Sequence, residues 1–173
     1  WGQTGRPNVP YMDSVLAPVG CTHSYFYNLG ETFTTNGHTA ISTGIYQSIN
    51  NTGGEYPQNP GIFQHYLKKH PDDKEFVWLI TSKDKLQVLS DCKDPKWKGK
   101  YIASTDCGVS GLGTGYRHDS ITFRRVMYAL EVHKPKLLLV NFREPDYSGH
   151  KADWNGYIRG IQQTDSMVHE IWK

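Results

Sequence analysis

Two short runs, Phe76-Val77-Trp78-Leu79-Ile80 and Leu137-Leu138-Leu139-Val140, decide the fold class of this sequence. Both are almost purely apolar instead of alternating between apolar and polar residues. Such runs are typical of strands that are covered on both faces, as in a parallel sheet between helices. We therefore expect both runs to form interior, mainly parallel strands. Weaker patterns favour a third strand at Tyr101-Ile102-Ala103 and a fourth, at an edge, over residues 23–28.

Helical patterns fall between these strands. The clearest covers about five turns, in which apolar residues recur at helical spacing from Trp154 to Trp172. Asp165 interrupts that apolar stripe, and a hydrogen-bonded structural carboxylate is favoured there over a polar site. Shorter helices are expected at residues 11–17, 37–45, 62–67 and 119–130, the last with Asp119 or Ser120 as its N-cap. This alternation predicts an α/β three-layer α/β/α sandwich with a mainly parallel sheet.

Size and composition fit one folded domain, residues 1–173, with 37% hydrophobic and 13% aromatic residues. The net charge is +2 and no long run of Lys or Arg occurs, so we expect no nucleic-acid partner. No apolar run approaches the ~20 residues of a membrane span. The three cysteines, Cys21, Cys92 and Cys107, allow at most one internal disulfide, and buried, inert thiols are favoured.

The first segment that could carry chemistry runs from Glu31 to Gly44, ETFTTNGHTAISTG. A hydroxyl-rich turn leads into a short helix, which puts Thr34 or Thr35 at a helix N-terminus. Free N–H groups and the positive end of the helix dipole favour a phosphoryl group or an alkoxide there. The simpler explanation is that Thr35 or Asn36 caps the helix, since both are favoured N-cap residues. This segment alone does not decide between them.

The second segment is Glu144-Pro145-Asp146-Tyr147-Ser148-Gly149-His150, just after the second apolar run. In open α/β sheets, active sites lie beyond the carboxyl ends of the strands. A carboxylate and an imidazole four residues apart suit a divalent metal such as zinc. A surface Asp beside a surface His explains the spacing equally well. Asp146 and His150 are therefore candidate metal ligands.

Taken together, the two segments resemble the alkaline phosphatase superfamily, most closely its phosphodiesterase and nucleotide-pyrophosphatase branch. In that superfamily the nucleophile starts a helix ten residues before the Gly of a Thr-Gly pair. Counting back from Gly44 gives Thr34 as the nucleophile, although Thr35-Asn36 also resembles the Thr-Asn of some relatives. The family's Asp-x-x-Gly-His element and the following helix, with its Tyr and later Asp, match in order here: Asp146, Gly149, His150, Tyr157 and Asp165.

The resemblance implies a metal-dependent hydrolase of phosphoric esters, a phosphodiesterase or phosphatase, that acts through a phospho-threonine intermediate. It implies two divalent metals, zinc above all, with Mn or Mg as alternatives, bound by Thr34, Asp146 and His150. Asn36 and His38 are candidate substrate-binding residues; for His38 a structural role is favoured, and a third reading is that it orients Thr34. The substrate would be a small phosphate ester, and the protein would be exported or periplasmic.

The family's remaining metal ligands, an Asp at the end of the first strand, an Asp-His pair and another His, have no counterpart between Trp1 and Lys173. We expect this sequence to be a central piece, truncated at both ends, that binds metal weakly and is inactive alone. Two alternatives stay open: a phosphotransferase, mutase or sulfatase-like member of the superfamily, although the threonine argues against a sulfatase, and a non-catalytic domain that binds an anion or a partner.

Overall fold

A computed structural model describes residues 8–23, 25 and 27–173 of the chain. The chain divides into two compact units, which we describe separately. One unit is Asn28–Asn141, and the other combines residues up to Tyr27 with Phe142–Lys173. The single catalytic domain expected from the sequence stays a prediction.

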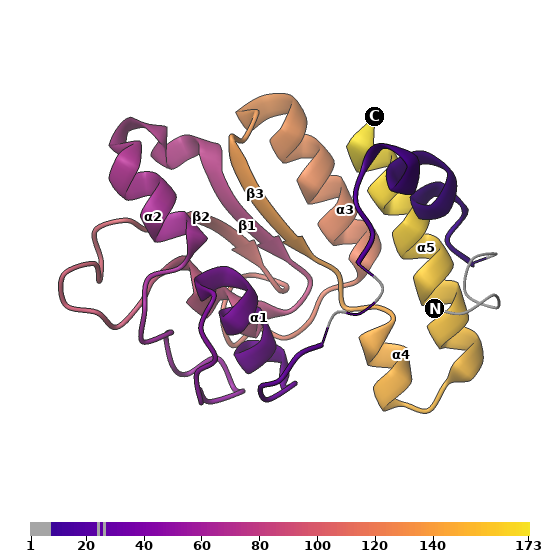
Figure 1. Ribbon diagram of the computed structural model, residues 1–173, viewed down its shortest axis with the longest axis horizontal. Coiled ribbons are helices and arrows are strands. Elements are labelled where there is room, and N and C mark those ends of the chain that lie inside the picture. Colours follow the sequence, from indigo (N-terminus) through magenta and orange to yellow (C-terminus); the bar gives the residue numbers. More distant parts are fainter. Residues whose placement is uncertain (1–7, 24, 26) are drawn as a thin grey trace. The chain divides into compact units, whose positions relative to one another are not determined.

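The larger unit is built on a parallel sheet in the order β2-β1-β3 (Figure 1). The central strand β1 (Val77–Thr81) pairs with β2 (Ser104–Cys107) on one side and with β3 (Leu137–Asn141) on the other. The register places Thr81 opposite both Cys107 and Asn141, so all three strands end at the same level. The predicted α/β class with a parallel sheet is confirmed.

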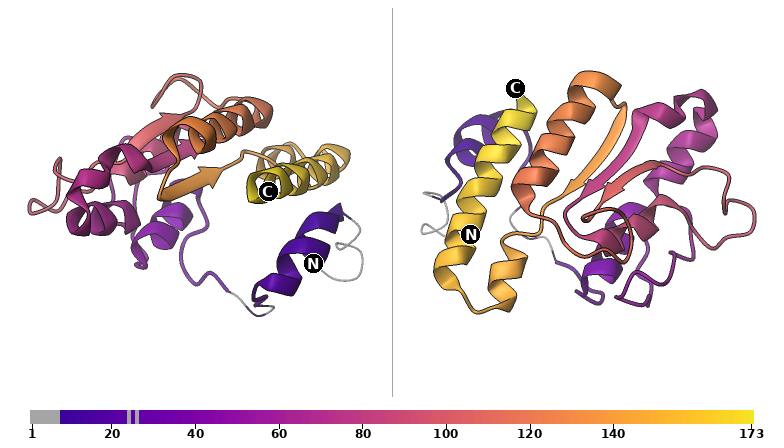
Figure 2. Two further views of the ribbon diagram at one scale, coloured as in Figure 1. Left: turned by 90° about the horizontal axis from the view of Figure 1, so that it is seen from above. Right: turned by 180° about the vertical axis from the view of Figure 1, so that it is seen from behind.

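Helices cover both faces of this sheet (Figure 2). Alternate residues of β1 point to opposite faces. Val77 and Leu79 belong to a buried cluster with α2 (Ile62–Lys69) and with η5 (Asp84–Ser90), a 3₁₀ helix directly after the strand. On the other face, α3 (Asp119–Tyr128) packs against β1, and Trp78 stacks on His133 with ring centroids 4.6 Å apart. The sandwich of helix, sheet and helix therefore follows from the apolar character of β1.

The strand predictions need three corrections. β3 is an edge strand of the described sheet and is half-buried along its length, so it is not interior as its apolar sequence predicts. The third strand begins at Ser104, just after the expected 101–103, because only from Ser104 onward does the chain pair with β1. For residues 23–28, positions 24 and 26 lie outside the described residues, and the others form no strand.

Most expected helices are present with shifted ends. α1 (Thr34–Thr43) begins earlier than expected, and α3 is capped by His118, whose side chain accepts from the Ser120 N–H, and not by Asp119 or Ser120. The remaining short helices are η2 (Met12–Leu16), η3 (Ala17–Val19), η4 (Pro71–Phe76) and η6 (Ala129–His133). No helix in the described part of the chain is long and apolar enough to cross a membrane.

The cysteines are all unpaired thiols. Cys92 and Cys107 are buried, as predicted, while Cys21 is exposed. Burial raises the pKa of the Cys107 thiol to about 11. A thiol this rarely ionised is a poor nucleophile and metal ligand, so Cys107 acts as a core side chain.

The smaller unit contains α4 (Asp146–His150) and the long α5 (Trp154–Trp172), whose N-cap Asp153 accepts from the Gly156 N–H. Asp165 is 1% exposed, and its two carboxylate oxygens accept the backbone N–H groups of Tyr11 and Met12, at 3.0 and 2.9 Å. These N–H groups stand at the start of η2 and have no partner within that helix. The expected structural role of Asp165 is confirmed.

Replacing Asp165 with Ala should therefore destabilise the protein. Two partly buried hydrogen bonds to a carboxylate are lost and two N–H groups are left without an acceptor, which should lower the free energy of unfolding by about 2–4 kcal/mol. Urea denaturation measures this change. Glu170→Ala on the exposed side of α5 removes only surface ion pairs, with Lys173 and His169, and should leave the free energy of unfolding almost unchanged. Equal effects of the two substitutions would contradict the assignment.

Candidate active site

Backbone hydrogen bonds define both ends of α1. The helix ends where Gly44 adopts a left-handed φ of 72° and donates its N–H to the Ala40 carbonyl, 2.8 Å away. At the other end the Phe33 carbonyl accepts the Gly37 N–H at 2.9 Å, which makes Thr34 the first helical residue. The N–H groups of this first turn have no partner inside the helix and carry the positive end of its dipole.

The two neighbouring threonines have different surroundings. Thr35 is fully buried, and its N–H and hydroxyl both donate to Asn51 Oδ1, at 3.0 and 3.1 Å. Thr34 is half-buried, and its hydroxyl makes no hydrogen bond to any residue that the structure describes. The Thr35 hydroxyl is thus engaged in structure, while the Thr34 hydroxyl is available to a ligand.

His38 and Asn36 hold the same turn. His38 Nδ1 lies 2.8 Å from the Thr34 carbonyl, and its Nε2 lies 3.1 Å from Asn141 Nδ2 at the end of β3. Since a carbonyl only accepts, Nδ1 carries a proton and donates, and Nε2 accepts from the amide. Asn36 is 3% exposed and donates to the Glu31 carboxylate. These contacts favour a positioning role for His38, and substrate binding by either residue stays a prediction.

Three further residues near this turn were missed in the sequence analysis: Asn51, Lys83 and Lys85. Lys85 Nζ donates to Asn51 Oδ1 at 3.1 Å, the same oxygen that binds Thr35. Lys83 is 4% exposed, and the ammonium groups of both lysines lie near the Tyr116 ring, 5.7 and 6.0 Å from its centroid. The positive charge of Lys85 therefore lies next to the first turn of α1. The position of the lysines just after β1, at the carboxyl edge of the sheet, is a signal that could have found them.

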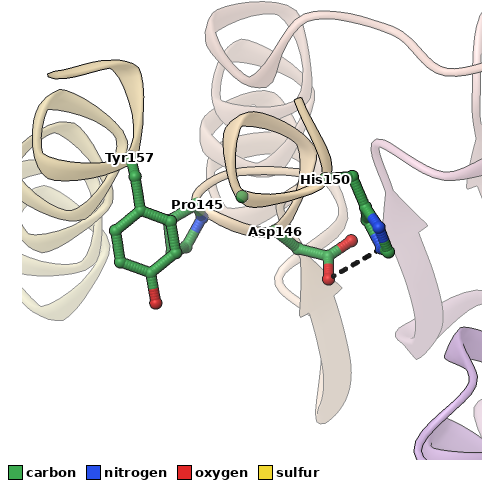
Figure 3. Close-up of a pocket in the computed structure, with 5 residues that line it drawn as sticks. Pro145, Asp146, His150 and Tyr157 are labelled. Atoms are coloured by element: carbon green, nitrogen blue, oxygen red, sulfur yellow. Dashed lines mark ion pairs between the residues drawn. The ribbon is translucent and has the colours of Figure 1, made fainter. Parts of the chain in front are cut away.

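In the smaller unit, α4 carries the second candidate pair. Asp146 and His150 stand one helical turn apart, with His150 Nε2 3.6 Å from Asp146 Oδ1 (Figure 3). They line a pocket of about 300 Å³ together with Pro145, Gly149 and Tyr157. Both side chains are largely exposed, at 78% for His150 and 53% for Asp146, so no core packing explains their approach. Beside them, a hydrogen bond from Lys151 lowers the pKa of the Tyr147 hydroxyl.

This pair fits one divalent ion. Two ligands that each lie about 2.1 Å from a tetrahedral zinc stand roughly 3.4 Å apart, close to the separation of the Asp146 and His150 atoms. The donor set, one carboxylate oxygen and one imidazole nitrogen, suits zinc. Within the described residues no three His, Cys, Asp or Glu side chains gather around a metal position, so this pair accounts for only part of a coordination sphere.

The comparisons with known proteins bear on this second pair. Residues 110–173 match the family model of the Metalloenzyme superfamily. That family belongs to the alkaline phosphatase-like clan, so this part of the chain is similar to enzymes that depend on a metal. The matched residues include Asp146 and His150 but not the segment of Thr34. No significant match was found among curated proteins or among solved structures.

The structure thus brings the predicted residues together in two groups. Thr34, Asn36 and His38 belong to one turn of the larger unit, and Asp146 and His150 belong to one turn of the smaller unit. The expectation that Thr34 meets the Asp146–His150 pair at a single site stays a prediction.

Replacing His150 with Ala in the full-length protein should weaken zinc binding by at least about tenfold. Even the loss of a residue that only hydrogen-bonds to a metal ligand lowers metal affinity by that factor. Asp146→Asn should act in the same direction. Competition with a chromophoric chelator at fixed pH measures the affinity. His70→Ala removes another exposed imidazole, at the end of α2, and serves as the matched control. Unchanged zinc affinity in His150→Ala would exclude this residue as a ligand.

Proposed function

We propose that this chain carries part of the active site of a metal-dependent hydrolase of phosphoric esters, with Thr34 as the nucleophile. The observation that carries the proposal is the start of α1. There, the half-buried Thr34, whose hydroxyl makes no hydrogen bond to the described residues, stands at the positive end of a helix, beside a threonine whose hydroxyl is already bound. The similarity of residues 110–173 to metalloenzymes supports it.

The surroundings of Thr34 suit a phosphoryl group. The oxygens of a phosphoryl group carry negative charge, which is stabilised by N–H donors at the start of a helix and by ammonium groups. Lys85 supplies an ammonium that is joined to the first turn of α1 through Asn51. An anion at this place would therefore meet positive charge that is already in position, which is how an active site stabilises developing charge without reorganisation.

The proposed reaction proceeds in two displacements. The Thr34 oxygen forms a bond to phosphorus while the bond from phosphorus to the alcohol oxygen of the ester breaks. The proton of the Thr34 hydroxyl passes to solvent, and the departing oxygen gains one. Water then attacks the phospho-threonine and restores the hydroxyl; inorganic phosphate is released when the substrate is a monoester, and a monoester is released when it is a diester.

Asp146 and His150 would hold a divalent ion, whose chemistry when bound is to polarise phosphoryl oxygens and favour deprotonation of the hydroxyl. Without such help a threonine hydroxyl is a weak nucleophile at neutral pH. His38 binds the Thr34 carbonyl and so keeps the backbone of the nucleophile in place. A non-catalytic anion-binding domain would share the donors around α1 but would not need the Thr34 hydroxyl.

Thr34→Ala in the full-length protein should lower turnover of an aryl phosphate by about a thousandfold or more, since no other group replaces the nucleophile. Thr34→Ser keeps a hydroxyl and should retain measurable turnover. Mass spectrometry of acid-quenched reactions should find the phosphoryl group on Thr34.

Thr35→Ser is the matched control, because it keeps the hydroxyl that binds Asn51. It should retain most of the activity. Full activity of Thr34→Ala, or a phosphoryl group trapped on Thr35, would contradict the assignment of the nucleophile.

A further inference from the structure

Lys85, which follows β1, carries a positive charge next to the first turn of α1. Lys85 Nζ and Thr35 N both contact Asn51 Oδ1, at 3.1 and 3.0 Å. The ammonium therefore lies no more than about 6 Å from Thr35 N, the two hydrogen bonds taken end to end, a range in which charges interact strongly near a protein surface. A phosphoryl group on Thr34 would be bonded to the residue next to this N–H.

The position of Lys85 is set by packing. The loop that carries Asn51 continues to Gly53, which has a φ of 85° and approaches the lysine so closely that a Cβ there would lie 2.9 Å from Lys85 Cα. Only glycine permits that conformation and that approach without strain. The close approach of Gly53 thus fixes the position of the Lys85 backbone relative to the loop that carries the Asn51 amide, which the Lys85 ammonium binds.

Lys83 adds a second cation to the same region. It is 4% exposed, and its ammonium shares the Tyr116 ring with that of Lys85. The intervening Asp84 accepts the Gly115 N–H at 2.9 Å, which turns its carboxylate toward Gly115. Both ammonium groups therefore lie near Tyr116, and that of Lys85 also reaches Asn51.

A cation beside a phosphoryl site distinguishes esters by charge. Near neutral and alkaline pH a phosphate monoester carries about two negative charges, whereas a diester carries one. For an ammonium at a separation of about 6 Å, and at the effective dielectric of a protein surface, one additional charge on the ligand is worth roughly 10- to 100-fold in affinity. A diester would gain only the part that its single charge provides.

We propose that Lys85 makes this site selective for dianionic phosphate monoesters over monoanionic diesters. The inference rests on the proposed function, since it concerns the same phosphoryl site. The preferred substrate is a phosphate monoester, which has one alcohol substituent.

The kinetic test compares 4-nitrophenyl phosphate with bis(4-nitrophenyl) phosphate, which share a leaving group, at pH 8 in the metal-loaded full-length protein. The parent protein should favour the monoester in kcat/KM. Lys85→Met should lower kcat/KM for the monoester by about 10- to 100-fold and for the diester by less than about threefold. Lys85→Arg keeps the charge and should recover much of the preference, while Lys100→Met, which removes an exposed lysine far along the chain, should change neither value.

A merely structural role predicts a different result. If Lys85 only holds Asn51 and Thr35 in place, Lys85→Met lowers both values of kcat/KM by the same factor, and the proposal is overturned. A parent protein that prefers the diester overturns it as well.

A binding experiment separates this inference from the proposed function. Calorimetric titration with inorganic phosphate, a dianion at pH 8, and with dimethyl phosphate, a monoanion, requires no turnover. Lys85→Met should weaken binding of phosphate by about 10- to 100-fold and leave dimethyl phosphate within about threefold. Absence of turnover with both esters would defeat the proposed function alone, whereas phosphate affinity that is absent or unchanged in the variant would defeat the inference.

Discussion

The parallel pairing of β1 with strands on both sides is the constraint on which the rest of the larger unit depends. Because Thr81 lies opposite both Cys107 and Asn141, the three strands end at the same level, and the residues that follow them lie at the carboxyl end of the sheet. Two connections run from that end to the first turn of α1. One passes from Asn141 through His38 to the Thr34 carbonyl, and the other passes from Lys85 through Asn51 to Thr35.

These two connections explain how the backbone around Thr34 is held in position. Its backbone is held by an imidazole with both ring nitrogens engaged, and the adjacent N–H and hydroxyl are held by an amide oxygen. The Thr34 hydroxyl is left for a ligand. Positioning of this kind removes the reorganisation that would otherwise accompany the reaction. Neither connection uses a residue of the Asp146–His150 pair, so the two halves of the proposed site can be tested separately.

The sequence predicted the fold class because β1 and the long helix α5 carry unambiguous apolar patterns. It failed for β3, since an apolar run indicates burial but does not tell an interior strand from an edge strand. The same limit applies to the site. Spacing motifs pointed to Thr34, Asp146 and His150, but Asn51 and Lys85 are separated from Thr34 by many residues and act through contacts that only folding creates. Asp165 was understood correctly, since a buried carboxylate requires donors.

We have proposed that Thr34 and the Asp146–His150 pair belong to one metal-dependent site. A crystal structure of the full-length protein with zinc and vanadate, which imitates the phosphoryl group in transit, tests it most directly. Vanadate should be bonded to the Thr34 oxygen, and the ion held by Asp146 and His150 should lie close to it, within the ~4 Å span of a two-metal site. A Thr34 hydroxyl more than about 10 Å from both side chains, well beyond that span, would contradict it.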